Sequence, residues 1–549
     1  MAFFNAYKAT QTDVPTYFIE STAPNNVDDR VPSKPKQLDH LTLIPDSNDA
    51  IRMIARDLAG PGHPNLVVMV HGFNNPLPEV LSTYTSAAIA VNGDDEIRKA
   101  GGVVCVGYRW PSERMGQPLV GTWDALPQLP TRILYLGLLL AAIPFLVFYL
   151  VPHGDRWIAD MARSICALVF DHLFTMIGLT LVGLILTSAL LRAIVYFRDN
   201  YRASNYGIPD LVQIIRAIDE ELLQQHYQGR KEDADANRAQ LSFIGHSMGA
   251  FVVTNTIRTL SDVFATPVKS LNAFGATAPV PSAELQKLGK TFVLKRFVLA
   301  SPDIPAEALL ANRGNFLASV LSRFEEAYLF SNEGDEVLRQ ISTLANYFVF
   351  PTKNSNHGFR LGNVEILSEG FGVIPYENKG GFLRKLRVGN LTLQQLNQRL
   401  VEAEAHRQGA DAGAAQLRPS PLPEVFTYFD CTDYVDLDNK GEKRPLLTFA
   451  KDFKRKDAKA KMSFHSHLRL LFAYLFWRRP NVHGGYFEGV LSQRLIYRLA
   501  CLGFRGTMAA FESEAKFADA CKEKQIRVMI SPSLRDPSPR PAAAKIRND

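Results

Sequence analysis

A serine lies between small residues in the segment Gly245-His246-Ser247-Met248-Gly249. The apolar run at 241–244 before it predicts a strand, and the residues from 250 to about 263 predict a helix. A strand, a G-x-S-x-G turn and a helix form the setting that raises a serine hydroxyl above a sheet as a nucleophile. The alternative is a closely packed helix-capping turn without chemistry. We expect Ser247 to attack an ester-like carbonyl.

A second motif could bind the oxyanion that such an attack creates. The continuous apolar run at 66–70 predicts a buried parallel strand, and it ends in His71-Gly72-Phe73-Asn74-Asn75. A turn after an early strand can supply one backbone N–H donor, and the residue after the nucleophile can supply the other. We therefore expect the amides of Phe73 and Met248 to form the oxyanion hole.

A third landmark gives these motifs a family resemblance. Residues 103–107 predict the next buried strand, and Tyr108-Arg109-Trp110-Pro111-Ser112 follows. The set HGFNN, WPS and GHSMG resembles a family of bacterial alpha/beta hydrolases of unknown function that carry HGFN and FSWPS. It is more distantly similar to esterases, lipases and GPI inositol deacylases. The resemblance spans about residues 65 to 500 and is weak after about 340. It departs at Arg109, where the family usually has a small residue.

The resemblance implies an α/β fold of the alpha/beta-hydrolase type, a mostly parallel sheet flanked by helices, with the chain order nucleophile, acid, histidine. Predicted strands at 296–300 and 327–331 are followed by Asp303 and Asp335 respectively. We prefer Asp335, because an aspartate after the seventh strand is the commonest acid in the fold, and Asp303 is the alternative. Either carboxylate would fix the tautomer of an imidazole. Both could instead be turn or N-cap residues.

Three histidines follow the predicted eighth strand at 425–431: His465, His467 and His483. We prefer His483, because its loop resembles the H-x-x-Y-F segment of the family and a loop histidine can reach the serine. His465 and His467 are the alternatives. Their H-x-H spacing could indicate a metal, but no cysteine or acidic spacing supports one. We expect neither a metal nor a cofactor.

Two apolar segments predict insertion into a membrane. Residues 133–151 and 173–191 are each 19 residues long and contain no charge, which is the length of a transmembrane helix. About 20 residues separate them, so they predict a hairpin inserted between the fourth strand and the helix that leads to the elbow. An interfacial or lid-like hairpin is the alternative. Enzymes anchored in this way could take substrates from the lipid phase.

Charge and cysteine patterns indicate the compartment. Arginines flank the hairpin mainly on the side of the hydrolase domain, namely Arg132, Arg192, Arg198 and Arg202. This bias predicts a cytoplasmic catalytic domain, at a bacterial inner membrane. The first ten residues contain no apolar core of a signal peptide, and five scattered cysteines fit a reducing compartment. The net charge of +6 is too small to indicate nucleic-acid binding.

Composition divides the chain into seven segments. They are an N-terminal lead-in at 1–60 with an edge strand at 16–19, a first hydrolase part at 61–130, the hairpin at 131–198, a second hydrolase part at 199–340, a cap and linker at 341–424, a C-terminal hydrolase part at 425–530, and a disordered tail at 531–549. Basic clusters at 451–461 and 476–479 predict either contact with anionic lipid headgroups or a solvated loop and a core helix.

These observations predict a membrane-anchored serine hydrolase that cleaves carboxylic esters through an acyl-enzyme. The membrane segments favour a lipid ester, such as a phospholipid or an acylglycerol, over small soluble esters and acyl-thioesters. Two alternative functions are also compatible with the sequence. One is an antibacterial lipase effector toxin, and the other is a non-catalytic membrane scaffold with a hydrolase fold.

Overall fold

The computed structural model divides the chain into two compact units, residues 1–113 with 199–549, and residues 114–198. The structure describes residues 4–10, 12–23, 41–112, 160–161, 164, 194–261, 286–309, 316–321, 323–342, 359–367, 370–376, 389–392, 395, 425–438, 440–449, 462, 464–473 and 480–535. The fold and the site described below belong to the first unit.

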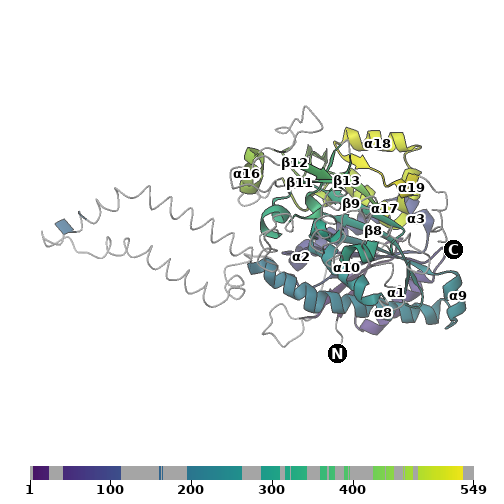
Figure 1. Cartoon of the computed structure of the whole chain (residues 1–549). Helices are drawn as coiled ribbons and strands as arrows, with labels where there is room; N and C mark the ends of the chain where they lie inside the picture. Colours follow the sequence, from purple (N-terminus) through teal and green to yellow (C-terminus); the bar gives the residue numbers. More distant parts are fainter. Residues whose placement is uncertain are drawn as a thin grey trace, which may run out of the picture. The chain divides into compact units, whose positions relative to one another are not determined.

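A central sheet organises the first unit (Figure 1). Its strand order is β16-β13-β9-β8-β6-β4-β5-β2-β1-β3, and β7 pairs with β8. The strands from β13 to β2 are parallel to their neighbours, whereas β16, β1, β3 and β7 are antiparallel additions. The bounds are β1 Phe4–Ala9, β2 Thr16–Ser21, β3 Leu41–Ile44, β4 Asn65–Val70, β5 Val103–Arg109, β6 Ala239–His246, β7 Lys287–Leu288, β8 Phe292–Ala300, β9 Glu326–Ser331, β13 Phe426–Asp430 and β16 Arg527–Met529.

Two groups of helices cover this sheet. One group contains α2 Leu77–Asn92, α3 Asp95–Ala100 and α17 Val490–Met508, which contact one another. The other contains α1 Ser47–Leu58, α8 Ile208–Gln225, α10 Met248–Leu260 and α12 Phe316–Leu321. Because helices shield both faces, inner strands such as β4 and β5 are buried at every position, which explains their unbroken apolar runs. The architecture is therefore α/β with a mostly parallel sheet, as predicted.

The remaining described elements lie outside the central sheet and its two groups of helices. A three-stranded antiparallel sheet contains β10 Glu365–Leu367, β11 Gly370–Tyr376 and β12 Gly389–Thr392. A hairpin contains β14 Val435–Leu437 and β15 Lys443–Pro445. The other helices are η1 Ala203–Gly207, α9 Lys231–Ala236, η3 Ala306–Leu309, η4 Val337–Ser342, η6 Leu361–Asn363, α16 Phe464–Phe472, η9 Gly485–Phe487, α18 Glu514–Glu523 and α19 Pro532–Arg535.

Three boundaries differ from the sequence-based expectation. The strand expected at the sheet edge, β2, lies between β5 and β1, because β1 and β3 extend the sheet beyond it. The strand predicted at 296–300 is β8, which begins four residues earlier at Phe292. Lys295 and Arg296 interrupt its apolar pattern, so the sequence did not indicate its first four residues. Ser531 is buried and donates its amide to Thr427 Oγ1 at 3.0 Å, so the folded chain reaches α19, inside the segment expected to be a disordered tail.

The predicted membrane spans at 133–151 and 173–191 lie outside the described residues, as do the basic clusters at 451–461 and 476–479. Among the helices that the structure does describe, none has the length and apolar character needed to cross a bilayer. Four of the five cysteines, Cys105, Cys431, Cys501 and Cys521, are buried free thiols, and Cys166 is outside the described residues.

Candidate active site

Ser247 occupies a sharp turn at the carboxyl end of the central strand β6. The strand ends at His246 and α10 begins at Met248, so a single residue makes the whole reversal. Its backbone has φ 54° and ψ −124°, a left-handed conformation that is strained for a serine. The Ser247 carbonyl accepts the amides of Ala250 and Asp303, both at 3.1 Å, and the Ser247 amide donates to Ala300 at 3.0 Å. Neighbouring strand ends therefore hold the strained residue in place.

Close backbone approach explains the glycines around this turn. A Cβ on Gly249 would overlap the carbonyl oxygen of Val70, because α10 begins directly against the end of β4. A Cβ on Gly72 would lie 2.7 Å from Ser247 Cβ and 3.2 Å from its Oγ. The His-Gly turn after β4 thus passes directly beside the serine hydroxyl, as the expected oxyanion hole requires.

His483 and Asp335 form a pair. The Nδ1 atom of His483 lies 2.7 Å from Asp335 Oδ2. A carboxylate only accepts, so Nδ1 carries the proton and Nε2 presents a lone pair. Asp335 is fully buried. Ser301 Oγ bonds Oδ2 as well, and two backbone amides of the following turn, at 3.1 and 3.2 Å, bond Oδ1. These donors stabilise the buried carboxylate and fix its direction.

Asn332 ties the acid loop to the histidine loop, a role that we did not anticipate. Its Oδ1 accepts the Gly334 amide at 2.9 Å, and its Nδ2 donates to the Val482 carbonyl at 2.8 Å. Val482, the residue before His483, is thus bonded to Asn332, which lies three positions before Asp335 in the chain. An asparagine opening the turn N-E-G-D was the available sequence signal, because Asn side chains commonly bond the backbone two residues on.

The two atoms that would react are both buried. Among the described residues, neither Ser247 Oγ nor His483 Nε2 has a hydrogen-bond partner. Buried polar atoms normally have partners, so both atoms remain available to make a hydrogen bond. The Met248 amide belongs to the first residue of α10, where helix N–H groups have no intrahelical acceptor. The Phe73 ring lies 6.3 Å from the His483 ring, centroid to centroid.

The alternative site residues have other partners. Asp303 Oδ1 lies 3.2 Å from Arg360 Nε, and its Oδ2 accepts from Ser342 Oγ at 3.1 Å. His467 is bonded through Nδ1 to Glu336 at 2.6 Å, and its Nε2 lies 2.8 Å from an Arg339 nitrogen. His465 is exposed on α16. The structure therefore joins Asp335 to His483 and places the His483 loop against His246, the neighbour of Ser247, whereas these three residues are bonded elsewhere or exposed.

His246 and His71 line the site from two sides. His246 Nε2 lies 3.1 Å from the His483 carbonyl oxygen, and the two rings are 5.0 Å apart. His71 stacks on Trp110 at 5.1 Å with nearly parallel planes, and Trp110 Nε1 donates to the His71 carbonyl at 3.0 Å. Arg109, the residue that departs from the family pattern, is buried and pairs with Glu20 at 2.7 Å, so its charge is compensated away from the serine.

We expect His71 to make the protein sensitive to mild acid. Burial is the main cause that lowers its pKa to about 3, and the nearby charge of Arg109 contributes to the same shift. The unfolded chain binds this proton below about pH 6.5 and the folded chain does not, so stability is complete above pH 6.5 and is lost as the pH falls towards 3. Between pH 7 and 5 the wild type should lose about 2 kcal/mol more unfolding free energy than His71→Gln. Parallel pH profiles for the two proteins would contradict this.

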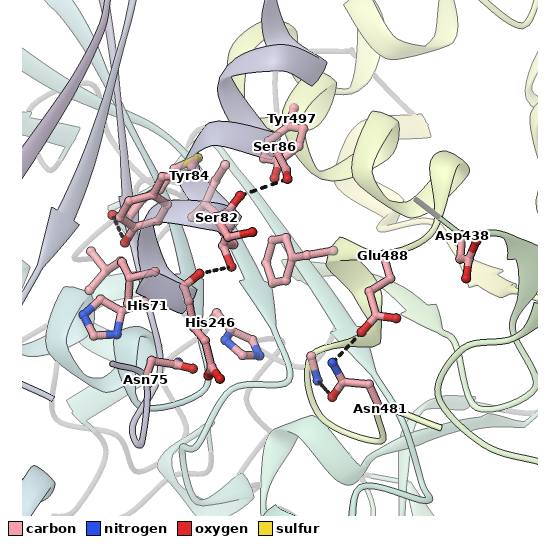
Figure 2. Close-up of a pocket in the computed structure, with 18 of the residues that line it drawn as sticks. His71, Asn75, Ser82, Tyr84, Ser86, His246, Asp438, Asn481, Glu488 and Tyr497 are labelled. Atoms are coloured by element: carbon pink, nitrogen blue, oxygen red, sulfur yellow. Dashed lines mark hydrogen bonds between the residues drawn. The ribbon is translucent and has the colours of Figure 1, made fainter. Parts of the chain in front are cut away.

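A cavity of about 480 Å³ adjoins the site (Figure 2). His71, Asn75 and His246 line one side of it, and Asn481 and Glu488 line the other. Glu488 accepts hydrogen bonds from Asn481 Nδ2 and from Arg444, both at 2.7 Å, and the arginine compensates its negative charge. The side chains of Ser247 and His483 do not line this cavity. It is therefore a neighbouring polar space and not the place where a substrate carbonyl meets the serine.

Within the described residues, no group of three or more histidine, cysteine or acidic side chains is arranged to hold a metal ion. In comparisons with known proteins, no family model, no curated protein and no solved structure matches this chain. The function of this protein is therefore inferred from the site itself.

Proposed function

We propose that this protein is a serine hydrolase that cleaves carboxylic esters through an acyl-enzyme. The observation that carries the proposal is the arrangement of three side chains. His483 Nδ1 is bonded to the buried Asp335, while His483 Nε2 and Ser247 Oγ are both buried without partners. A nucleophile on a strained turn, beside an imidazole oriented by a carboxylate, is the arrangement that activates a serine hydroxyl.

In this proposal Ser247 Oγ attacks the ester carbonyl while its proton passes to His483 Nε2. The Asp335 carboxylate stabilises the resulting imidazolium through Nδ1. The amides of Phe73 and Met248 bind the oxyanion, a contribution of about 3 kcal/mol for each donor in related chemistry. His483 then protonates the leaving alcohol as the acyl-enzyme forms. A water molecule, deprotonated by the same imidazole, releases the acid and restores Ser247.

The topology supports an alpha/beta-hydrolase fold within the wider α/β class. Ser247 follows β6, Asp335 follows β9 and His483 follows β13, and these parallel strands end at one edge of the sheet. The order nucleophile, acid, histidine is the one that this fold uses. Active sites of open α/β sheets commonly lie beyond the carboxyl ends of the strands.

We further propose that the substrate is a lipid ester and that the chain is anchored in a bilayer. The support comes from the sequence: two uncharged 19-residue segments lie at 133–151 and 173–191. Their position between β5 and the helix leading to the elbow would bring the bilayer to the hydrolase domain. We therefore favour a phospholipid or an acylglycerol over a small soluble ester as the substrate.

Matched esters test the substrate proposal. The full-length protein in mixed micelles should hydrolyse p-nitrophenyl palmitate at least about tenfold faster than p-nitrophenyl butyrate, because the two esters share a leaving group and the longer chain buries several more methylene groups. The protein should also stay in the membrane fraction after alkaline carbonate washing. Ser247→Ala at equal concentration is the control. Equal rates on both esters, or release by carbonate, would contradict the lipid assignment and leave the esterase proposal in place.

A further inference from the structure

The turn that carries Phe73 is bonded to a residue far along the chain. Asn74, in the middle of this turn, has φ 58°, a left-handed conformation that asparagine tolerates at some cost. Its amide donates to Asp199 Oδ2 at 2.8 Å. Asp199 is fully buried and lies 125 residues later in the chain. A buried carboxylate thus accepts the amide of a strained residue directly after the proposed oxyanion donor.

Ser112 completes a clamp with Asp199. The Ser112 hydroxyl donates to Asp199 Oδ2 at 2.8 Å and accepts the Asn75 amide at 3.1 Å. Ser112 is itself fully buried, and Arg109 donates to its carbonyl at 3.2 Å. Two successive amides of the turn are therefore held by one connected pair of acceptors, Asp199 and Ser112.

The clamp determines the direction of the Phe73 N–H. The Asn75 side chain donates from Nδ2 to the Gly72 carbonyl at 3.2 Å, and His71 Nδ1 lies 2.7 Å from the same oxygen. In a trans peptide the C=O and the following N–H point in opposite directions. Fixing the direction of the Gly72 oxygen therefore also fixes the direction of the Phe73 N–H, on the opposite side of the same peptide. Asn75 can hold that oxygen because Ser112 fixes the Asn75 backbone.

The charge of Asp199 is compensated locally. Arg202, also buried, lies 3.6 Å away through Nη1. An isolated buried carboxylate near a forming oxyanion would oppose it, whereas a carboxylate that is paired with an arginine opposes it less. The arrangement is therefore compatible with an oxyanion hole on the other side of the same peptides.

We propose that Asp199, acting with Ser112, is a positioning residue that aims the Phe73 amide at the oxyanion. The inference rests on the proposed serine hydrolase function. Asp199 touches no substrate, and it acts through the backbone of the Phe73-Asn74-Asn75 turn. Ser112 and Asp199 both belong to the first unit, and residues 114–198 lie between them in the chain.

The test measures how fast full-length, detergent-solubilised protein is labelled by a fluorophosphonate probe, whose phosphoryl oxygen occupies an oxyanion hole. Asp199→Asn should lower the second-order labelling rate about 10- to 100-fold, with the final extent of labelling unchanged. Ser112→Ala should lower it about tenfold. The double variant should be no slower than Asp199→Asn, because the two residues act as one unit.

Asp219→Asn is the matched control. Asp219 is also buried and accepts two successive amides, from Lys290 and Thr291 at 2.8 and 2.7 Å, but in a turn at the opposite end of the sheet. It should label within twofold of the wild type. A lower extent of labelling at an unchanged rate in the Asp199 and Ser112 variants would show a purely structural role and overturn the inference. Wild-type labelling rates in both variants would overturn this inference and leave the hydrolase proposal in place. An unlabelled wild-type protein would overturn the hydrolase proposal itself.

Discussion

Replacing Ser247 with alanine is expected to abolish ester hydrolysis, lowering kcat about a million-fold or to the background rate. No other hydroxyl is held at this turn, and the whole reaction starts from the Ser247 Oγ atom. The variant should fold normally, because that oxygen makes no hydrogen bond among the described residues. Removing a buried, unpartnered hydroxyl should leave the melting temperature unchanged or slightly higher. Initial rates on a lipid ester and on p-nitrophenyl butyrate, with a thermal unfolding curve, measure both effects.

The matched control is Ser242→Ala on the same strand. Ser242 is also fully buried, and its hydroxyl likewise has no partner among the described residues. This variant should keep wild-type rates. Activity that survives in Ser247→Ala, or that is lost equally in Ser242→Ala, would refute the assignment of the nucleophile.

Replacing Asp335 with asparagine is expected to lower kcat about 10⁴-fold with little change in KM. Asparagine can donate to Nδ1, which would place the imidazole proton on Nε2 and remove the base that faces Ser247. A neutral amide also fails to stabilise the imidazolium. The carboxylate accepts from His483, Ser301 and two backbone amides, so a stability loss of about 1–3 kcal/mol should accompany the kinetic effect.

The Asp303→Asn variant distinguishes the role of Asp303 from that of Asp335. Asp303 is as deeply buried and is paired with Arg360, so its replacement should also destabilise the fold. It should not change the tautomer of His483, so kcat for each folded molecule should stay within about tenfold of the wild type. If Asp303→Asn were the more damaging of the two for kcat, Asp335 would not be the acid.

Local signals predicted much of this site. The glycines around Ser247 mark a turn that only small residues permit, and the apolar runs of β4, β5 and β6 mark strands buried on both faces. The order of the motifs along the chain then limited the candidates for the triad carboxylate to Asp335 and Asp303. It could not choose between them, because both follow parallel strands and the choice depends on which aspartate the His483 loop reaches in space.

Long-range contacts could not be predicted. Asp199 and Ser112 are 125 and 37 residues from their partners in the Phe73-Asn74-Asn75 turn, and no local pattern connects them. Asn332 reaches across 150 residues to the loop of His483. His467 resembled a candidate base in sequence, but its hydrogen bonds to Glu336 and Arg339, which follow Asp335 in the chain, appear only in the folded structure. Such residues contact the proposed site through tertiary hydrogen bonds. Their residue types occur throughout the sequence and therefore do not mark them.

The central claim is that Ser247 is an activated nucleophile. The most direct measurement is intact-mass and peptide mapping of the folded, full-length protein after reaction with a fluorophosphonate, in the presence and absence of lipid micelles. The account predicts one adduct per chain, on Ser247, and no adduct in Ser247→Ala or His483→Ala. Well-folded wild-type protein that remains unlabelled under both conditions, or an adduct on another serine, would contradict it.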